Sequence, residues 1–160
     1  MQSVNIICIG KLKEKYLSDA IKEYSTRLTP FCKFQIIELD EYRLPDKPSE
    51  AQIKTCLEEE GKKILAKISK GSYVIPMCIE GKIISSEELS GVIQDAAVSG
   101  KSTVDFVIGG SFGLSDEVKK RGDFRLSMGR MTFPHQLVRV MLSEQIYRSF
   151  QIMTGGKYHK

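Results

Sequence analysis

Val107-Ile108-Gly109-Gly110-Ser111-Phe112-Gly113-Leu114 is the stretch that decides the fold, because an apolar run passes directly into three glycines and the start of a helix. Its apolar part belongs to a segment from 103 to 108 with the composition of a buried strand. Glycines after such a strand let a ligand approach the backbone closely. The alternative for this segment alone is a plain tight turn, because it lacks the G-x-G-x-x-G spacing of dinucleotide-binding proteins.

Strands and helices alternate outward from this stretch in both directions. Further strands are expected at 4–9, 34–39, 73–79 and 124–128, and helices at 16–28, 49–68, 85–98, 114–120 and 134–153. This alternation predicts an α/β fold with a mostly parallel sheet of five to six strands and helices on both faces. Ligands bind such sheets beyond the carboxyl ends of the strands, so the loops after Ile79, Ile108 and Met128 are the candidate site.

Composition bounds the class of protein. The 160 residues are the usual size of one domain, so we expect a single domain over 1–160. No apolar run approaches the ~18 residues that would span a bilayer, and the lysines that follow the apolar N-terminus are in the wrong order for a secretion signal. The four cysteines form no C-x-x-C pair, and only two histidines could assist them. We therefore expect a cytoplasmic protein without membrane or metal.

The charge is unevenly distributed. The net charge is +4, which by itself does not identify a nucleic-acid partner. From Lys119 to the C-terminus, however, nine Lys and Arg residues face only Asp123 and Glu144. A polyanion would be drawn to this last quarter of the chain.

A second unusual segment is Leu126-Ser127-Met128-Gly129-Arg130-Met131-Thr132-Phe133-Pro134-His135, which contains adaptable methionines, a glycine and an aromatic residue before a helix. Such a loop could enclose an adenine and a sulfonium. The alternative is that Met128, Met131 and Phe133 are ordinary core residues and that Pro134 simply begins the helix.

The last helix carries polar groups within an apolar surface. Gln136, Arg139 and Ser143 share one face, and His135 lies one turn before Arg139, where the two could meet a phosphate. The alternative for Arg139 is a solvated charge on an ordinary helix. Apolar residues cover so much of the remaining surface that a second subunit is a natural cover.

The C-terminal Lys157-Tyr158-His159-Lys160 combines an aromatic ring that can stack on a base, an imidazole and two cations. Terminal residues are usually frayed, and the alternative is that they have no role. No Ser/His/Asp set, metal cluster or Walker loop competes with these four segments.

Taken in order, these segments resemble one family over almost the whole chain, the RlmH-type SPOUT methyltransferases. The resemblance is carried by Ile9-Gly10-Lys11-Leu12-Lys13, Phe106-Val107-Ile108-Gly109-Gly110 with Gly113-Leu114, Met131-Thr132-Phe133-Pro134-His135, Val138-Arg139-Val140 with Glu144-Gln145-Ile146-Tyr147-Arg148, and Tyr158-His159-Lys160. The last three of these groups are the most specific.

The resemblance implies a C-terminal trefoil knot that holds S-adenosyl-L-methionine, with S-adenosyl-L-homocysteine as the product. True knots are rare among proteins. By the same resemblance the protein is a homodimer in which the partner helps to complete each site. The implied cofactor contacts are Met77, Gly109, Gly110, Leu126, Ser127, Met128, Gly129, Arg130, Met131, Thr132 and Phe133.

The implied reaction is methylation of N3 of a pseudouridine, position 1915 of 23S ribosomal RNA, on the assembled ribosome. His159 is the candidate base, Arg139 the candidate for stabilising the imide anion, and Tyr158 the candidate for stacking on the target base. The candidate RNA contacts are His135, Arg130, Lys157 and Lys160. Two other interpretations remain open, namely a nucleotide-binding α/β module and a non-enzymatic ribosome-associated factor.

Overall fold

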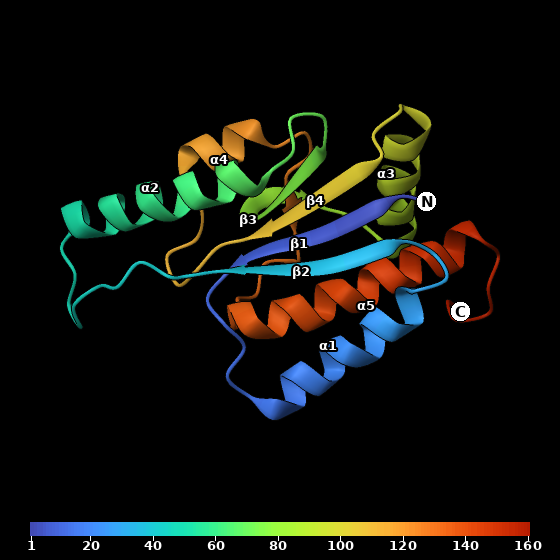
Figure 1. Cartoon of the computed structure of the whole chain (residues 1–160), viewed down its shortest axis with the longest axis horizontal. Coiled ribbons are helices and arrows are strands. Elements are labelled where there is room, and N and C mark those ends of the chain that lie inside the picture. Colours follow the sequence, from blue (N-terminus) through green and yellow to red (C-terminus); the bar gives the residue numbers. More distant parts are fainter.

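A five-stranded sheet in the order β2-β1-β4-β3-β5 forms the middle of the computed structural model, which describes residues 1–160 (Figure 1). All four strand pairs are parallel. The strands are β1 Ser3–Ile9, β2 Lys33–Leu39, β3 Tyr73–Ile83, β4 Thr103–Ile108 and β5 Leu126–Ser127. The helices are α1 Lys15–Leu28, α2 Glu50–Lys67, α3 Ser86–Val98, α4 Asp116–Arg121 and α5 His135–Met153. The α/β architecture predicted from the sequence is confirmed.

Helices cover both faces of the sheet because its central strands are apolar on both sides. In β1, Val4, Ile6 and Cys8 pack on one face, among α1, α3 and α5, while Ile7 and Ile9 pack on the other, against α2 and α4. Figure 1 shows α2 and α4 on one side of the strands and α1 and α5 on the other. None of the helices is both long enough and apolar enough to cross a membrane.

Both capping boxes form as expected. The Ser49 hydroxyl accepts from the Gln52 backbone N–H while the Gln52 side chain accepts from the Ser49 N–H, and Ser85 and Glu88 make the same exchange at the start of α3. Each box satisfies two backbone donors that a helix start leaves without partners. The bounds of all five helices agree with the expected ones to within two residues.

The third strand is longer than expected. A loop was predicted after Ile79, but β3 continues to Ile83, with a shift in register between Met77 and Lys82 where it pairs with β5. Gly81 permits this pairing, because a Cβ there would lie 2.6 Å from the backbone of Leu126. The fifth strand is shorter than the predicted range 124–128 and comprises only Leu126–Ser127.

Leu142→Ala is expected to lower the free energy of unfolding by about 2–5 kcal/mol, because Leu142 is fully buried between α5 and the sheet and its removal leaves a cavity. Val98→Ala at the end of α3, where the side chain is 82% exposed, is expected to change it by less than about 0.5 kcal/mol. Urea denaturation of the two variants and the parent measures both values, and equal losses would contradict this assignment of the core.

Candidate functional site

A cavity of about 450 Å³ lies at the carboxyl ends of β4 and β5, beside the middle of β3. Its volume is in the usual range for small-molecule sites. It lies where ligands bind open parallel sheets, outside the strand ends. Its lining comes from Met77–Ile79, Ile108–Ser111 with Gly113, Leu126–Gly129, Met131–His135 and Val138.

The glycine turn after β4 forms one wall of this cavity. A Cβ at Gly109 would overlap the carbonyl group of Gly113, so this position accepts no side chain without a shift of the backbone. Gly113 has a φ of +87°, and its N–H donates to the carbonyl oxygen of Gly110 at 3.1 Å. The turn thus presents bare backbone to the cavity, as the sequence predicted.

The methionine-rich segment forms the opposite wall. The Ser127 hydroxyl accepts from the Gly129 N–H at 3.2 Å and donates to the Gly129 carbonyl oxygen at 3.1 Å, which closes a tight turn in which Gly129 has a φ of +121°. Beyond it, Met131 is 76% exposed and Phe133 is half-buried. The interpretation of Met131 as an ordinary core residue is therefore wrong.

The structure brings nearly all the expected cofactor residues to this one cavity. Of the eleven residues predicted to contact the cofactor, only Arg130 does not line it, and His135, expected to contact RNA, does line it. Residues separated by as much as 56 positions, from Met77 to Phe133, are thus neighbours. That the cofactor binds there stays a prediction.

The cavity lining contains one titratable imidazole and no side chain of Asp, Glu, Lys or Arg. Burial and then the charge of Arg139 lower the pKa of His135, while Glu41 opposes this and Lys13 adds slightly to it. A lowered pKa leaves this imidazole neutral at neutral pH. Because no charged side chain lines the cavity, and backbone carbonyls and thioethers do, the lining fits an adenosine that bears a sulfonium.

Arg139 on α5 is fully buried and links the start of this helix to the ends of two strands. Its Nη2 donates to the carbonyl oxygens of Ile9 and Gly10 at 2.7 and 2.9 Å, and its Nη1 pairs with the Glu38 carboxylate at 2.9 Å. The interpretation of Arg139 as a solvated charge is therefore wrong. A direct role on the substrate stays a prediction that would require these contacts to open.

The same face of α5 is tied to the segment that follows β1. The Gln136 amide accepts from the Lys13 N–H and donates to the carbonyl oxygen of Lys11, both at 3.3 Å. Ser143, expected on the same face, donates to the Arg139 carbonyl oxygen within the helix. Together with Arg139 these contacts fix the helix start that borders the cavity.

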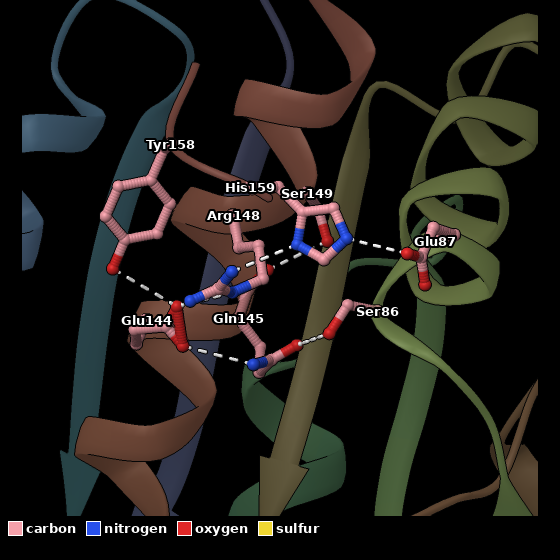
Figure 2. A network of polar contacts seen from close by, with 8 residues as sticks. All are labelled: Ser86, Glu87, Glu144, Gln145, Arg148, Ser149, Tyr158 and His159. Atoms are coloured by element: carbon pink, nitrogen blue, oxygen red, sulfur yellow. Dashed lines mark hydrogen bonds and ion pairs between the residues drawn. The ribbon is translucent and has the colours of Figure 1, made fainter. Parts of the chain in front are cut away.

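Tyr158 and His159 lie elsewhere, on the flank of α5 (Figure 2). Neither lines the 450 Å³ cavity. Their partners Glu87 and Glu144 belong to α3 and α5, and Glu144 also lines a second cavity of about 460 Å³ that shares Leu126, Ser127 and Met128 with the first. Within one chain the candidate cofactor residues and the candidate substrate residues thus occupy different places, while Lys157 and Lys160 remain exposed.

Sequence reasoning missed the acidic residues of the site. Glu60 on α2 is buried, accepts from the Tyr42 N–H at 3.0 Å and lies against Gly110, where a Cβ would be 3.3 Å from its carboxylate. Burial raises the pKa of Glu60, and the hydrogen bond from Tyr42 opposes this. The sequence did not indicate that Glu60 is buried, because it is the last of three consecutive glutamates. Only its position around the helix axis distinguishes it from the more exposed Glu58 and Glu59.

Comparison with known proteins agrees with the resemblance noted in the sequence. The family model described as "Predicted SPOUT methyltransferase" matches residues 2–159. The chain is 52% identical over 158 residues to "Ribosomal RNA large subunit methyltransferase H" of Clostridium acetobutylicum, with 99% of each chain covered. It is 50% identical over 157 residues to the protein of that name in Streptococcus pneumoniae, with 98% of this chain and 99% of the relative covered.

Two solved structures share the fold at low sequence identity. A probable methyltransferase from Bordetella pertussis superposes with a TM-score of 0.58 at 12% identity, covering 93% of this chain and 95% of that one. A probable methylase family protein from Haemophilus influenzae gives a TM-score of 0.55 at 15% identity, covering 98% of this chain and 70% of that one. At these identities the likeness extends to the fold alone.

Arg139→Gln is expected to lower the free energy of unfolding by roughly 3 kcal/mol, because it removes a buried cation and leaves two carbonyl oxygens and Glu38 without their partner. Arg43→Gln, in the exposed loop before α2, is the matched control and is expected to cost less than about 0.5 kcal/mol. Chemical denaturation measures both variants, and a cost for Arg139→Gln no larger than the control's would contradict the linking role.

Glu60→Gln is expected to gain stability relative to the parent as the pH rises. Because burial raises the pKa of Glu60, the folded parent loses stability as the pH rises through that value, and a neutral amide has no such loss. Urea denaturation at about pH 4.5 and about pH 8 measures the difference. Glu58→Gln, on an exposed side of the same helix, is the control, and an equal pH dependence in both variants would refute the assignment.

Proposed function

This chain belongs to the SPOUT methyltransferase family, and from that premise we propose that it is an S-adenosyl-L-methionine-dependent methyltransferase of large-subunit ribosomal RNA. Two relatives that align with it over almost their full length carry the name ribosomal RNA large subunit methyltransferase H. The observation that carries the proposal is that the glycine turn and the methionine-rich segment line one cavity.

The cofactor would be held mainly by backbone groups. The residues that would hold it are Gly109 and Gly110, the segment Leu126 to Phe133, and Met77 in the middle of β3. When bound, it supplies a methyl group made electrophilic by its sulfonium. The expected knot, formed by the C-terminal part of the chain, is part of this proposal and is supported by family membership.

The finer proposal is that the methyl group goes to N3 of a pseudouridine in 23S ribosomal RNA, at position 1915. N3 is an imide N–H between two carbonyls and is a poor nucleophile until its proton leaves, so a placed base or cation would add roughly 10²-fold. The remaining barrier must be lowered by holding the base in a reactive orientation. The resemblance supports this assignment, whereas the names of the relatives support the coarser one, methylation of large-subunit ribosomal RNA.

Tyr158 and His159 are the residues proposed to meet the target base. Tyr158 would stack on it or orient it. For His159 two roles compete: it accepts the N3 proton, or it only shapes the site and the proton leaves to water. Arg139 is proposed to act from within the fold, by fixing the start of α5, because its guanidinium is fully buried.

A homodimer is proposed because cofactor and substrate residues do not meet within one chain. The side of α5 that faces the second cavity carries Val140 and Met141, both partly exposed, and Ile83 nearby is 61% exposed. A second copy covering this surface would bring its own Tyr158 and His159 near the cofactor cavity. Apolar patches of this kind commonly mark subunit interfaces.

The proposed RNA surface follows the basic residues near the cavity and the tail. Arg130 and the neutral His135 lie by the cavity, whereas Lys157 and Lys160 extend from the tail. With no additional RNA-binding domain among the described residues, recognition is proposed to depend on the shape of the assembled ribosome. The Lys and Arg side chains would contribute phosphate contacts that weaken with salt.

Gly110→Val is expected to abolish cofactor binding and methylation, because its side chain would collide with Glu60 and Ile9 and displace the turn. Isothermal titration with S-adenosyl-L-methionine, and mass spectrometry of 23S rRNA from ribosomes incubated with the protein and cofactor, measure the two effects. Gly91→Ala on α3, where a Cβ would meet nothing, is the control and should retain both.

Binding measurements with other ligands and with ribosomes separate the rival functions. A nucleotide-binding module would bind flavin or ATP in place of S-adenosyl-L-methionine, and a non-enzymatic ribosome factor would bind ribosomes equally well without it. If ribosomal RNA from cells lacking this protein kept its 3-methylpseudouridine, the proposed substrate would be wrong.

A further inference from the structure

The C-terminal His159 is held at both ring nitrogens by side chains from two different helices (Figure 2). Its Nε2 lies 2.6 Å from the Glu87 carboxylate on α3, and its Nδ1 lies 3.0 Å from Nη1 of Arg148 on α5. The His159 side chain is 27% exposed and that of Arg148 25% exposed, so both are largely withdrawn from solvent. An ordinary frayed terminus would make neither contact.

The two partners together define where the proton sits on the ring. A guanidinium has only donors and stays protonated, so the Nδ1 that faces Arg148 must be the acceptor and carries no hydrogen. A carboxylate has only acceptors, so the Nε2 that faces Glu87 must carry the hydrogen. The arrangement therefore selects the neutral imidazole with its proton on Nε2.

We propose that Glu87 and Arg148 are positioning residues that fix His159 as this single tautomer and thereby hold the C-terminal tail in place for catalysis. In this state the only basic nitrogen of the ring already accepts a hydrogen bond from Arg148. His159 therefore orients the tail and does not accept the N3 proton. Of the two roles considered above, the geometry favours the one in which the proton leaves to water.

Arg148 also places the neighbouring tyrosine. Its Nε donates to Glu144 at 2.7 Å, and its guanidinium carbon lies 4.8 Å from the centre of the Tyr158 ring. The Tyr158 hydroxyl donates to the same Glu144 carboxylate at 3.3 Å, and its ring meets that of Tyr147 edge-on at 4.8 Å. One arginine thus determines the position of both tail residues proposed to meet the target base.

Glu87 connects the tail to a second helix on the same face of the sheet. It lies in the first turn of α3, whereas Arg148 and Glu144 lie on α5, so the imidazole bridges two helices that pack against each other. Hydrogen bonds in which one partner is ionised are the stronger kind. Loss of either partner would leave the imidazole free to rotate and to exchange tautomers.

The tautomer is tested by NMR on the intact protein. Correlations between ring carbon protons and ring ¹⁵N nuclei distinguish the two neutral tautomers and the imidazolium, and with only two histidines in the chain the spectrum is simple to assign. We expect the Nε2–H form for His159 near neutral pH. The Nδ1–H form, a tautomer mixture or an imidazolium would overturn the proposal.

Variants test the positioning role. In Glu87→Ala the His159 signal should become a tautomer mixture, and kcat should fall at least about tenfold while the KM for cofactor is unchanged. Glu87→Gln removes the same charge from the start of α3 but keeps an acceptor for Nε2–H, so it should restore the single tautomer and most of kcat. Glu58→Ala, an exposed carboxylate on α2, is the control and should change neither.

Arg148→Leu should free Nδ1 of His159 and lower kcat further than Glu87→Ala, because it also releases Tyr158. Arg148→Lys keeps a hydrogen-bond donor and tests whether any loss of kcat is due to misfolding.

The catalytic half of the inference rests on the proposed function, whereas the tautomer does not. A single Nε2–H tautomer in a protein that methylates no RNA would refute the proposed function alone. Unchanged tautomer and kcat in both Glu87→Ala and Arg148→Leu would refute the positioning role alone.

Discussion

The buried guanidinium of Arg139 is the contact on which the rest of the site depends. It binds the carbonyl oxygens that end β1 and the Glu38 carboxylate near the end of β2, and so joins the first part of the chain to the last helix. These groups are more than 100 positions away in sequence. Because a buried cation without partners is costly, the helix start can occupy only one place over the strand ends.

That fixed helix start determines the shape of the candidate cofactor cavity. His135 and Val138 line it from the first turn of α5, and the segment before them must return from β5 to reach that point. The glycine turn supplies the facing wall, supported from behind by the Glu60 carboxylate. Two buried ionisable groups thus lie next to the cavity, Arg139 under the start of α5 and Glu60 beside the glycine turn.

The separation of Tyr158 and His159 from this cavity gives the molecule its second functional feature. A polar network centred on Arg148 holds the tail on the flank of α5, where it neighbours the second cavity. Within a single chain, therefore, the candidate cofactor cavity and the C-terminal tail lie in different places. The partly exposed apolar residues between them are consistent with completion of the site by a second copy.

The sequence by itself determined the alternating elements, the two capping boxes, the glycine turn and the loops where a ligand would lie, because these follow from local patterns of apolar residues, caps and glycines. The individual residues that line the cavity were indicated by the resemblance to a known family, in agreement with the loops that the strand-end rule selects. Only the tertiary structure decided that Arg139 is buried, that Glu60 lies against Gly110 and that Glu87 holds His159. Each of these is a contact of a charged side chain with a group distant in sequence, and a charged side chain on a helix looks the same in sequence whether it faces solvent or a partner from another element.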